Sequence, residues 1–272
     1  LIMGTFGLSI VKKLGNGNVV KGYSSFAVVI AVAFIISAII TCLNVKERVE
    51  TPKNAEKVSF KQTLNIIRKN DQLVVFIGIV LGMNLIMQIS GSMAIYYFTY
   101  VVGKENLFSV YQAFAGIAEI SGLVLLPILT KKIGREDVFK FGSILPIAGF
   151  LLLFVAGIVA PQNALFIGMA GAILKLGSGF LLGSTTIMLA DVVDYGEFKL
   201  GTRNESIVFS VQTLLVKGAS AVAGWLVGVG LSLVGYVAGE VQSATTILGM
   251  RVIMIWIPIV CAIVMYTIYK SK

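Results

Sequence analysis

Three charged side chains lie inside long apolar stretches of this 272-residue chain. Glu119 is part of AFAGIAEISGLVLLP, Lys175 of GAILKLGSGFLLG and Lys217 of SVQTLLVKGASAVAGW. If these stretches cross a membrane, a charge at their centre costs roughly 3 kcal/mol, so each residue is a candidate functional group. The alternative is an internal salt bridge that only braces the protein.

The depths of the three charges suggest different roles. Lys217 lies eleven residues into its stretch, about 16 Å at ~1.5 Å per residue, which is too deep for its side chain to reach the surface easily. A functional or gating role is therefore favoured for Lys217. Glu119 and Lys175 lie near the middle of their own stretches, and this matching depth predicts an ion pair between them. The pair would either line a cavity or brace it.

A third candidate is a polar helical face, in which Asn84, Gln88 and Gly91 follow at spacings of four and three. Three tyrosines come next: Tyr96, Tyr97 and Tyr100. Amides that donate and accept hydrogen bonds, beside aromatic rings that stack on pyranose faces, are typical of sugar sites. An interfacial aromatic belt is the alternative for Tyr97 and Tyr100.

The segments that hold these residues must be membrane helices. The chain is 57% hydrophobic and 13% charged, and several windows of about 20 residues are apolar on all sides. Residues 1–14 have the pattern of the end of a truncated span, and 23–43 of a complete one. Six more spans are expected at 73–102, 108–130, 138–160, 164–190, 206–237 and 247–269.

Residues 44–72 predict a central loop with seven Lys or Arg residues and a short interfacial helix in SFKQTLNIIRKNDQL. Phe60, Leu64 and Ile67 would form its apolar side, and Ser59 its cap. Counted on alternate sides of the expected spans, fifteen Lys or Arg residues oppose five. This asymmetry places the loop and the C-terminus in the cytoplasm.

This order of segments predicts an all-α polytopic membrane protein. It matches the C-terminal six-helix half of a major facilitator fold plus the end of the N-terminal half. The expected divisions are 1–43 (part of helix 5, and helix 6), 44–72 (the cytoplasmic loop) and 73–272 (helices 7 to 12).

The spans expected at 164–190 and 206–237 are joined by the stretch LADVVDYGEFKLGTRNESIVF, which is acidic although the chain as a whole is basic. Four carboxylates face two cations: Asp191, Asp194, Glu197 and Glu205 against Lys199 and Arg203. The sequence has no P-loop and no histidine, which argues against ATP hydrolysis and histidine-based catalysis. We expect no enzyme, no metal site and no cofactor. The scattered basic residues argue against nucleic acid as a partner.

LADVVDYGEFKLGTRNESIVFSVQTLLVKGASA resembles the connector between helices 10 and 11 of the glycoside-pentoside-hexuronide:cation symporters, most closely the melibiose carriers. AIYYFTYVVG, SILP and LGMRVIMI extend the resemblance over nearly the whole chain. It implies a symporter of the bacterial inner membrane that imports a galactoside such as melibiose by alternating access. The implied partners are the sugar, a coupling cation (Na⁺, Li⁺ or H⁺), the lipid bilayer and a missing N-terminal half that holds the cation-binding carboxylates.

The resemblance also implies residue roles. Lys217 would lie near the sugar and cation sites, with Asn84 and Gln88 in the same neighbourhood. Charged contacts between the halves at a cytoplasmic gate would come from Asp191, Asp194, Tyr195 and Arg203, with Glu205 in a supporting role. Glu119 and Lys175 replace neutral amides of the family, a change that could alter sugar preference. The alternative is an uncoupled facilitator or sensor of the same fold for another glycoside or a hexuronide.

Overall fold

A computed structural model describes residues 2–45 and 60–271, and every regular element in these ranges is helical. The chain forms two compact units, Leu1–Phe60 and Lys61–Lys272. The expected Ser59 cap and most of the central loop lie outside the described residues.

The first unit is a helical hairpin of α1 (Ile2–Gly15) and α2 (Val19–Asn44). Asn16 and Gly17 take positive φ values of 44° and 91° in the tight turn between them, and the Asn18 side chain caps α2 by accepting from the Lys21 amide. Gly22 lies against the backbone of Val11, where a Cβ would clash. The hairpin is therefore held close at its turn.

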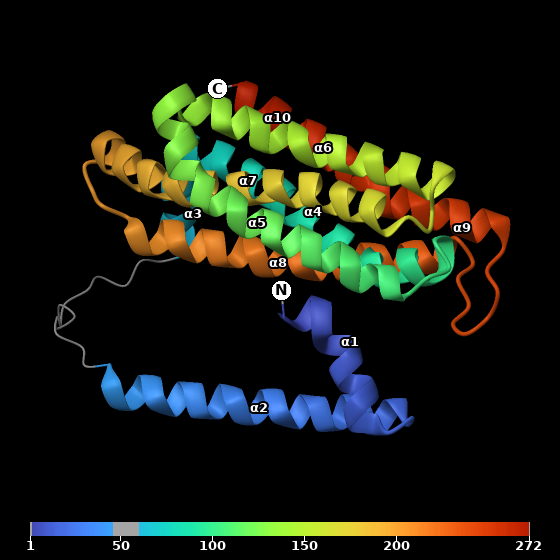
Figure 1. Cartoon of the computed structure of the whole chain (residues 1–272). Coiled ribbons are helices and arrows are strands. Elements are labelled where there is room, and N and C mark those ends of the chain that lie inside the picture. Colours follow the sequence, from blue (N-terminus) through green and yellow to red (C-terminus); the bar gives the residue numbers. More distant parts are fainter. Residues whose placement is uncertain (1, 46–59, 272) are drawn as a thin grey trace. The chain divides into compact units, whose positions relative to one another are not determined.

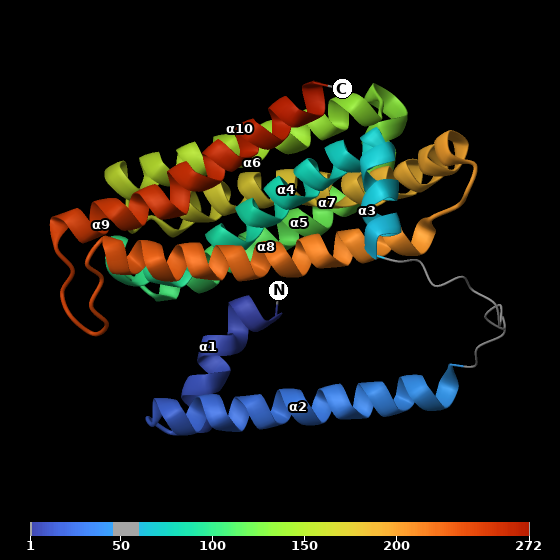
Figure 2. The ribbon, with the colours of Figure 1, turned by 180° about the vertical axis from the view of Figure 1, so that it is seen from behind.

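The second unit is a bundle of long helices that run side by side, as seen from opposite sides in Figures 1 and 2. Its elements in chain order are α3 (Phe60–Lys69), α4 (Asp71–Tyr96), η1 (Tyr97–Val101), α5 (Asn106–Ile133), α6 (Arg135–Val159), α7 (Ala164–Leu200), α8 (Glu205–Leu233), α9 (Ala244–Arg251), η2 (Val252–Trp256) and α10 (Ile257–Lys270).

Helix α7 is central to the packing, because it lies against both α5 and α6, whereas α4 lies against α8 and α10. The contact between α5 and α7 depends on glycine. A Cβ on Gly122 would lie 2.7 Å from the Leu176 carbonyl oxygen, and one on Gly179 would clash with the carbonyl of Glu119. Small residues let membrane helices approach this closely and gain dispersion energy. We name this contact the α5–α7 seam.

Most predicted spans agree with the helices to within a few residues, but the last part of α7 does not. The span expected at 164–190 continues as helix to Leu200, so most of the acidic stretch is helical and not a loop. Its residues include no proline, and the helix ends only at Gly201, whose φ of 71° suits a C-terminal cap. Only residues 201–204 separate α7 from α8.

The interfacial helix expected in the central loop is present as α3, which begins at Phe60 and ends at Lys69. Its Ile66 and Ile67 pack against a cluster that includes Leu73 and Val192. The side chain of Asn70 caps α4 at the Leu73 amide and also donates to the Val192 carbonyl at 3.1 Å. One buried amide thereby ties the start of α4 to α7.

Seven helices of the described residues are long and apolar enough to cross a membrane, which confirms the prediction of an all-helical polytopic protein. Two of these spans contain a π-helical turn, η1 after α4 and η2 between α9 and α10. Such turns widen the helix locally and expose carbonyls that need other partners. The first of them, η1, contains Tyr97 and Tyr100, which are described below.

Candidate functional site

Glu119 and Lys175 form the predicted ion pair. Lys175 Nζ lies 3.1 Å from Glu119 Oε1 and 3.4 Å from Oε2. The two side chains are 27% and 21% exposed, so the pair is largely shielded but open on one side. The α5–α7 seam brings their backbones together, since Gly171 and Gly179 stand one helical turn before and after Lys175.

The exposed side of this ion pair is flanked by further exposed residues on α5 and α7. On α7, Leu182 and Thr186 follow Lys175 at spacings of seven and four and are exposed. On α5, Leu123 lies one turn after Glu119 and is also exposed. The pair therefore lies at the edge of the seam and not in the core of the bundle.

Lys217 has the opposite surroundings. Its side chain is exposed on α8, and among the described residues it has no hydrogen-bond or ion-pair partner. It borders a shallow open depression with Phe209, Ser210, Thr213 and Leu214. An unpaired ammonium group at this depth in a span is costly unless something else solvates it or pairs with it.

Exposed small and polar residues share the α8 face with Lys217 at helical spacing. They are Ser206, Ser210, Thr213 and Ser220, with Gly224 one turn further on. The hydroxyls of Ser210 and Thr213 donate to carbonyls of their own helix, at 2.7 and 3.0 Å. Lys217 is therefore the one charged side chain of this face of α8 beyond its first turn.

The amide pair expected on α4 is split by the structure. Asn84 is only 8% exposed, and its amide donates to the Val80 carbonyl of its own helix at 2.8 Å. Gln88 is half-buried and has no hydrogen-bond partner among the described residues. Gly91 is exposed. Of the two amides, Gln88 is thus the one available to a ligand in this conformation.

The three tyrosines serve packing rather than a shared polar face. Tyr97 is 1% exposed, and its hydroxyl donates to the Leu153 carbonyl at 3.4 Å. Tyr96 and Tyr100 both contact the ring of Tyr236, whose hydroxyl bonds that of Tyr100 at 3.1 Å. Tyr97 therefore does not fit the exposed aromatic belt that was its alternative.

The acidic stretch is organised around Arg203. Its guanidinium lies 2.6 Å from Glu197, 3.0 Å from Asp194 and 3.2 Å from Glu205. Glu197, followed by Asp194 and Glu205, raises the pKa of Arg203, which therefore stays charged. One cation thus faces three carboxylates, and the cluster keeps an excess of negative charge beside the α7–α8 turn.

The other charges of the acidic stretch reach different helices. Tyr195 donates to Asp71 Oδ1 at 2.9 Å, and Lys199 forms an ion pair with the same carboxylate. Asp191 pairs with Arg135 at 3.3 Å, with both side chains more than half exposed. These partners belong to the same unit, so the stretch links α4, α6, α7 and α8 at one end of the bundle.

The comparisons with known proteins agree with this architecture. Residues 1–270 match the family described as MFS/sugar transport protein. The chain belongs to this family. Membership confirms the major facilitator fold and a transport class, and it confirms that the chain is not an enzyme.

Relatives within this MFS/sugar transport family carry several sugar names. The chain is 32% identical over 95% of its length to an isoprimeverose transporter of Lactiplantibacillus pentosus, and 29% identical over 92% to a lactose permease of Lactobacillus helveticus. It is 30% identical over 99% to a Salmonella typhimurium protein whose name proposes sulfoquinovose import. These alignments cover 54%, 39% and 57% of the relatives, so the chain spans about half the length of those it matches most.

Sequence reasoning on this family member missed two residues that organise its charged end, Asp71 and Arg135. Asp71 lies two residues before the span predicted at 73–102 and Arg135 three residues before the span predicted at 138–160, where a charge ordinarily needs no special explanation. In the structure they are the first residues of α4 and α6. Their proximity to α7 depends on helix packing. The flanking residues Asn70, a helix cap, and Gly134, a turn residue with a φ of 88°, mark such helix starts.

Proposed function

We propose that this chain is the C-terminal part of a cation-coupled sugar symporter that works by alternating access. The observation that carries the proposal is the match of residues 1–270 to a family of sugar transport proteins. Coupling in such a carrier means that cation binding raises sugar affinity, and that sugar raises cation affinity by the same factor. The cation-binding carboxylates would be supplied by the other half of the carrier.

Within this proposal, Lys217 is the group of the C-terminal half that faces the sugar and cation sites. Its lack of a partner among the described residues supports this role, because a membrane-embedded ammonium needs a counter-charge or polar ligand. The exposed polar face of α8 would then meet the other half. Gln88, whose amide has no hydrogen-bond partner among the described residues, is the second candidate for sugar contact.

The Glu119–Lys175 pair has a separate proposed role, as a wall of the polar path. Its open side would be expensive against acyl chains and favourable against water or sugar hydroxyls. The resemblance implies neutral amides at these two positions, so the pair would add two charges while its net charge stays zero. It would therefore change hydrogen-bond preference for the sugar without changing the charge balance of the site.

The acidic stretch would act at the cytoplasmic gate. We propose that Asp191, Asp194, Tyr195 and Arg203, supported by Glu205, exchange partners between the halves when the carrier opens outward. The excess of carboxylates around Arg203 supports this idea, since it leaves negative charge for a basic partner elsewhere. On this orientation the C-terminus is cytoplasmic, and the membrane is a bacterial inner membrane, as the bacterial relatives suggest.

The substrate proposed is a galactoside such as melibiose, with Na⁺, Li⁺ or H⁺ as the coupling ion. The test is uptake of labelled melibiose, lactose and a glucuronide by the complete carrier in vesicles, with and without an imposed sodium gradient. Accumulation that needs the gradient supports symport. Equilibration without accumulation would instead indicate an uncoupled facilitator. Uptake of the glucuronide alone would indicate that the substrate is a hexuronide and not a galactoside.

A further inference from the structure

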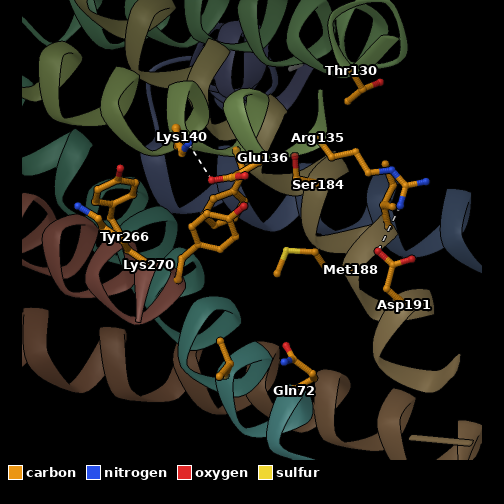
Figure 3. A pocket seen from close by; sticks show the side chains of 14 residues that line it. Gln72, Thr130, Arg135, Glu136, Lys140, Ser184, Met188, Asp191, Tyr266 and Lys270 are labelled. Atoms are coloured by element: carbon orange, nitrogen blue, oxygen red, sulfur yellow. Dashed lines mark hydrogen bonds and ion pairs between the residues drawn. The ribbon is translucent and has the colours of Figure 1, made fainter. Parts of the chain in front are cut away.

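A cavity of about 650 Å³ opens at the charged end of the second unit, among α4, α6, α7 and α10. Figure 3 shows side chains from these helices pointing into it from several sides. This volume is in the range of small-molecule sites in proteins. It is lined by residues other than Lys217, Gln88, Glu119 and Lys175.

The cavity is lined by polar groups that lack protein partners. Gln72, Ser184, Tyr266 and Lys270 have no hydrogen bond or ion pair within the described part of the chain. Ser184 is informative because hydroxyls in membrane helices normally bond their own backbone, as Thr185 does to the Leu181 carbonyl at 2.9 Å. The Ser184 hydroxyl, on a residue only 8% exposed, is instead free for a ligand.

The charge of the lining favours an anion. It carries three cations, Arg135, Lys140 and Lys270, and two carboxylates, Glu136 and Asp191. Both carboxylates are already engaged, Asp191 by Arg135 at 3.3 Å and Glu136 by Lys140 at 2.8 Å. Asp137, outside the lining, shares Lys140 at 3.1 Å. Within the described ranges Lys270 therefore remains a positive charge without an ion-pair partner, beside several neutral donors.

We propose that this cavity binds a phosphate ester, which the positive charges of Lys270 and Arg135 attract from opposite sides and which accepts hydrogen bonds from donors of the lining such as Ser184, Gln72 and Tyr266. Several donors around a positive charge match the acceptor oxygens of a phosphate group. Basic pockets between membrane helices are suited to phospholipid headgroups, and the cavity lies at the end of the bundle where the membrane surface must be. A soluble phosphorylated metabolite on that side presents the same chemistry.

Occupancy would change the charged end of the bundle. A phosphate oxygen at Arg135 competes with Asp191, because both seek the same guanidinium. Displacement of Asp191 would free a carboxylate on the helix that also carries Asp194 and Tyr195. The bound ligand would thereby change which ion pairs the acidic stretch forms, and this effect would not depend on the sugar that is carried.

The test uses the complete carrier in nanodiscs of phosphatidylcholine, with two probes. In one arm phosphatidylglycerol is added and the lipids retained are counted by native mass spectrometry. In the other arm glycerol 3-phosphate is titrated calorimetrically. Lys270→Gln should weaken the probe that binds by about fivefold, the factor expected for one cation near a phosphate. Ser184→Ala should weaken it about threefold, as for one neutral hydrogen bond.

Lys131→Gln is the matched control, because it removes the same charge from the end of α5 without touching the cavity lining. It should change binding by less than about twofold. Retention of phosphatidylglycerol alone assigns the site to lipid, and binding of glycerol 3-phosphate alone assigns it to a metabolite. The proposal is overturned if neither probe binds above the phosphatidylcholine background, or if Lys131→Gln weakens binding as much as Lys270→Gln.

Discussion

Lys175 and Lys217 lie eleven and twelve residues past the first residue of their helices, yet the bundle treats them differently. Lys175 is held by Glu119 at 3.1 Å at the edge of the glycine-rich α5–α7 seam. Lys217 lies on an open face of α8 with no partner among the described residues. The same side chain at similar depth is therefore satisfied in one place and unsatisfied in the other.

The difference shows how helix packing separates a structural charge from one available for binding. A largely shielded pair is stabilised by its geometry, and removing one member leaves a charge with no compensation. An unpaired charge contributes little to folding but keeps its electrostatic attraction for a ligand. Stability should therefore depend on Lys175 and Glu119, and transport on Lys217.

The largest expected effect comes from breaking the pair. Glu119→Gln in the complete carrier should lower the free energy of unfolding by about 2–4 kcal/mol, because Lys175 is left partly buried without a counter-charge. Denaturant unfolding in detergent measures the loss. Lys175→Gln added to Glu119→Gln should restore most of it. Purely additive losses in the double variant would show that the pair is not energetically coupled.

A smaller loss of stability is expected when the two helices of the α5–α7 seam are forced apart. Gly179→Ala places a methyl group against the Glu119 carbonyl and should cost about 1–3 kcal/mol of stability. The matched change Gly218→Ala, next to Lys217, meets no atom within 4 Å among the described residues and should be neutral or slightly stabilising. Thermal unfolding of the two variants side by side is the measurement. Equal losses would remove the contrast between the regions.

Lys217→Gln should impair transport and leave stability nearly unchanged, in contrast to the variants of the ion pair and the seam. Uptake should fall by about tenfold or more, as expected for loss of a charged hydrogen bond, while the free energy of unfolding changes by less than about 0.5 kcal/mol. Lys104→Gln, an exposed lysine in the loop between η1 and α5, is the charge-matched control and should transport normally. A Lys217 variant that unfolds easily yet transports at the usual rate would reverse the assignment.

A small effect on stability is also expected at Arg203, which is half-exposed. Arg203→Ala should leave the free energy of unfolding nearly unchanged, since exposed ion pairs contribute little. In the proposed gate it should shift the carrier towards the inward-open state and slow active uptake more than it weakens sugar binding. Uptake and binding in membrane vesicles separate the two. Unchanged uptake would argue against the gate.

Much of this architecture could be predicted from sequence, because a membrane span is set by its own composition and length. The spans at 108–130 and 138–160 agree with α5 and α6 to within a few residues. The matching depths of Glu119 and Lys175 also sufficed to predict their pairing. Both inferences need only the position of each residue along its own helix.

Predictions were less complete where they also needed to know which side of a helix packs against its neighbours. Asn84 and Gln88 share a helical face in sequence. Only the packing of the bundle buried Asn84, whose amide bonds its own helix, and left Gln88 without a hydrogen-bond partner in the described part of the chain. The extension of α7 to Leu200 was missed because the span was ended where its apolar residues end. Charged residues can continue a helix, and here the helix ends only at the left-handed cap of Gly201.

The sequence by itself determined a membrane protein, its spans, and which charges must be explained, because the cost of polar groups in hydrocarbon acts on each segment separately. Only the tertiary structure decided which charges are satisfied. It paired Lys175 and left Lys217 open, it brought Asp71 and Arg135 to the acidic stretch, and it formed the cavity around Ser184 and Lys270. Those outcomes depend on contacts between helices that are distant in the chain, and no single segment encodes them.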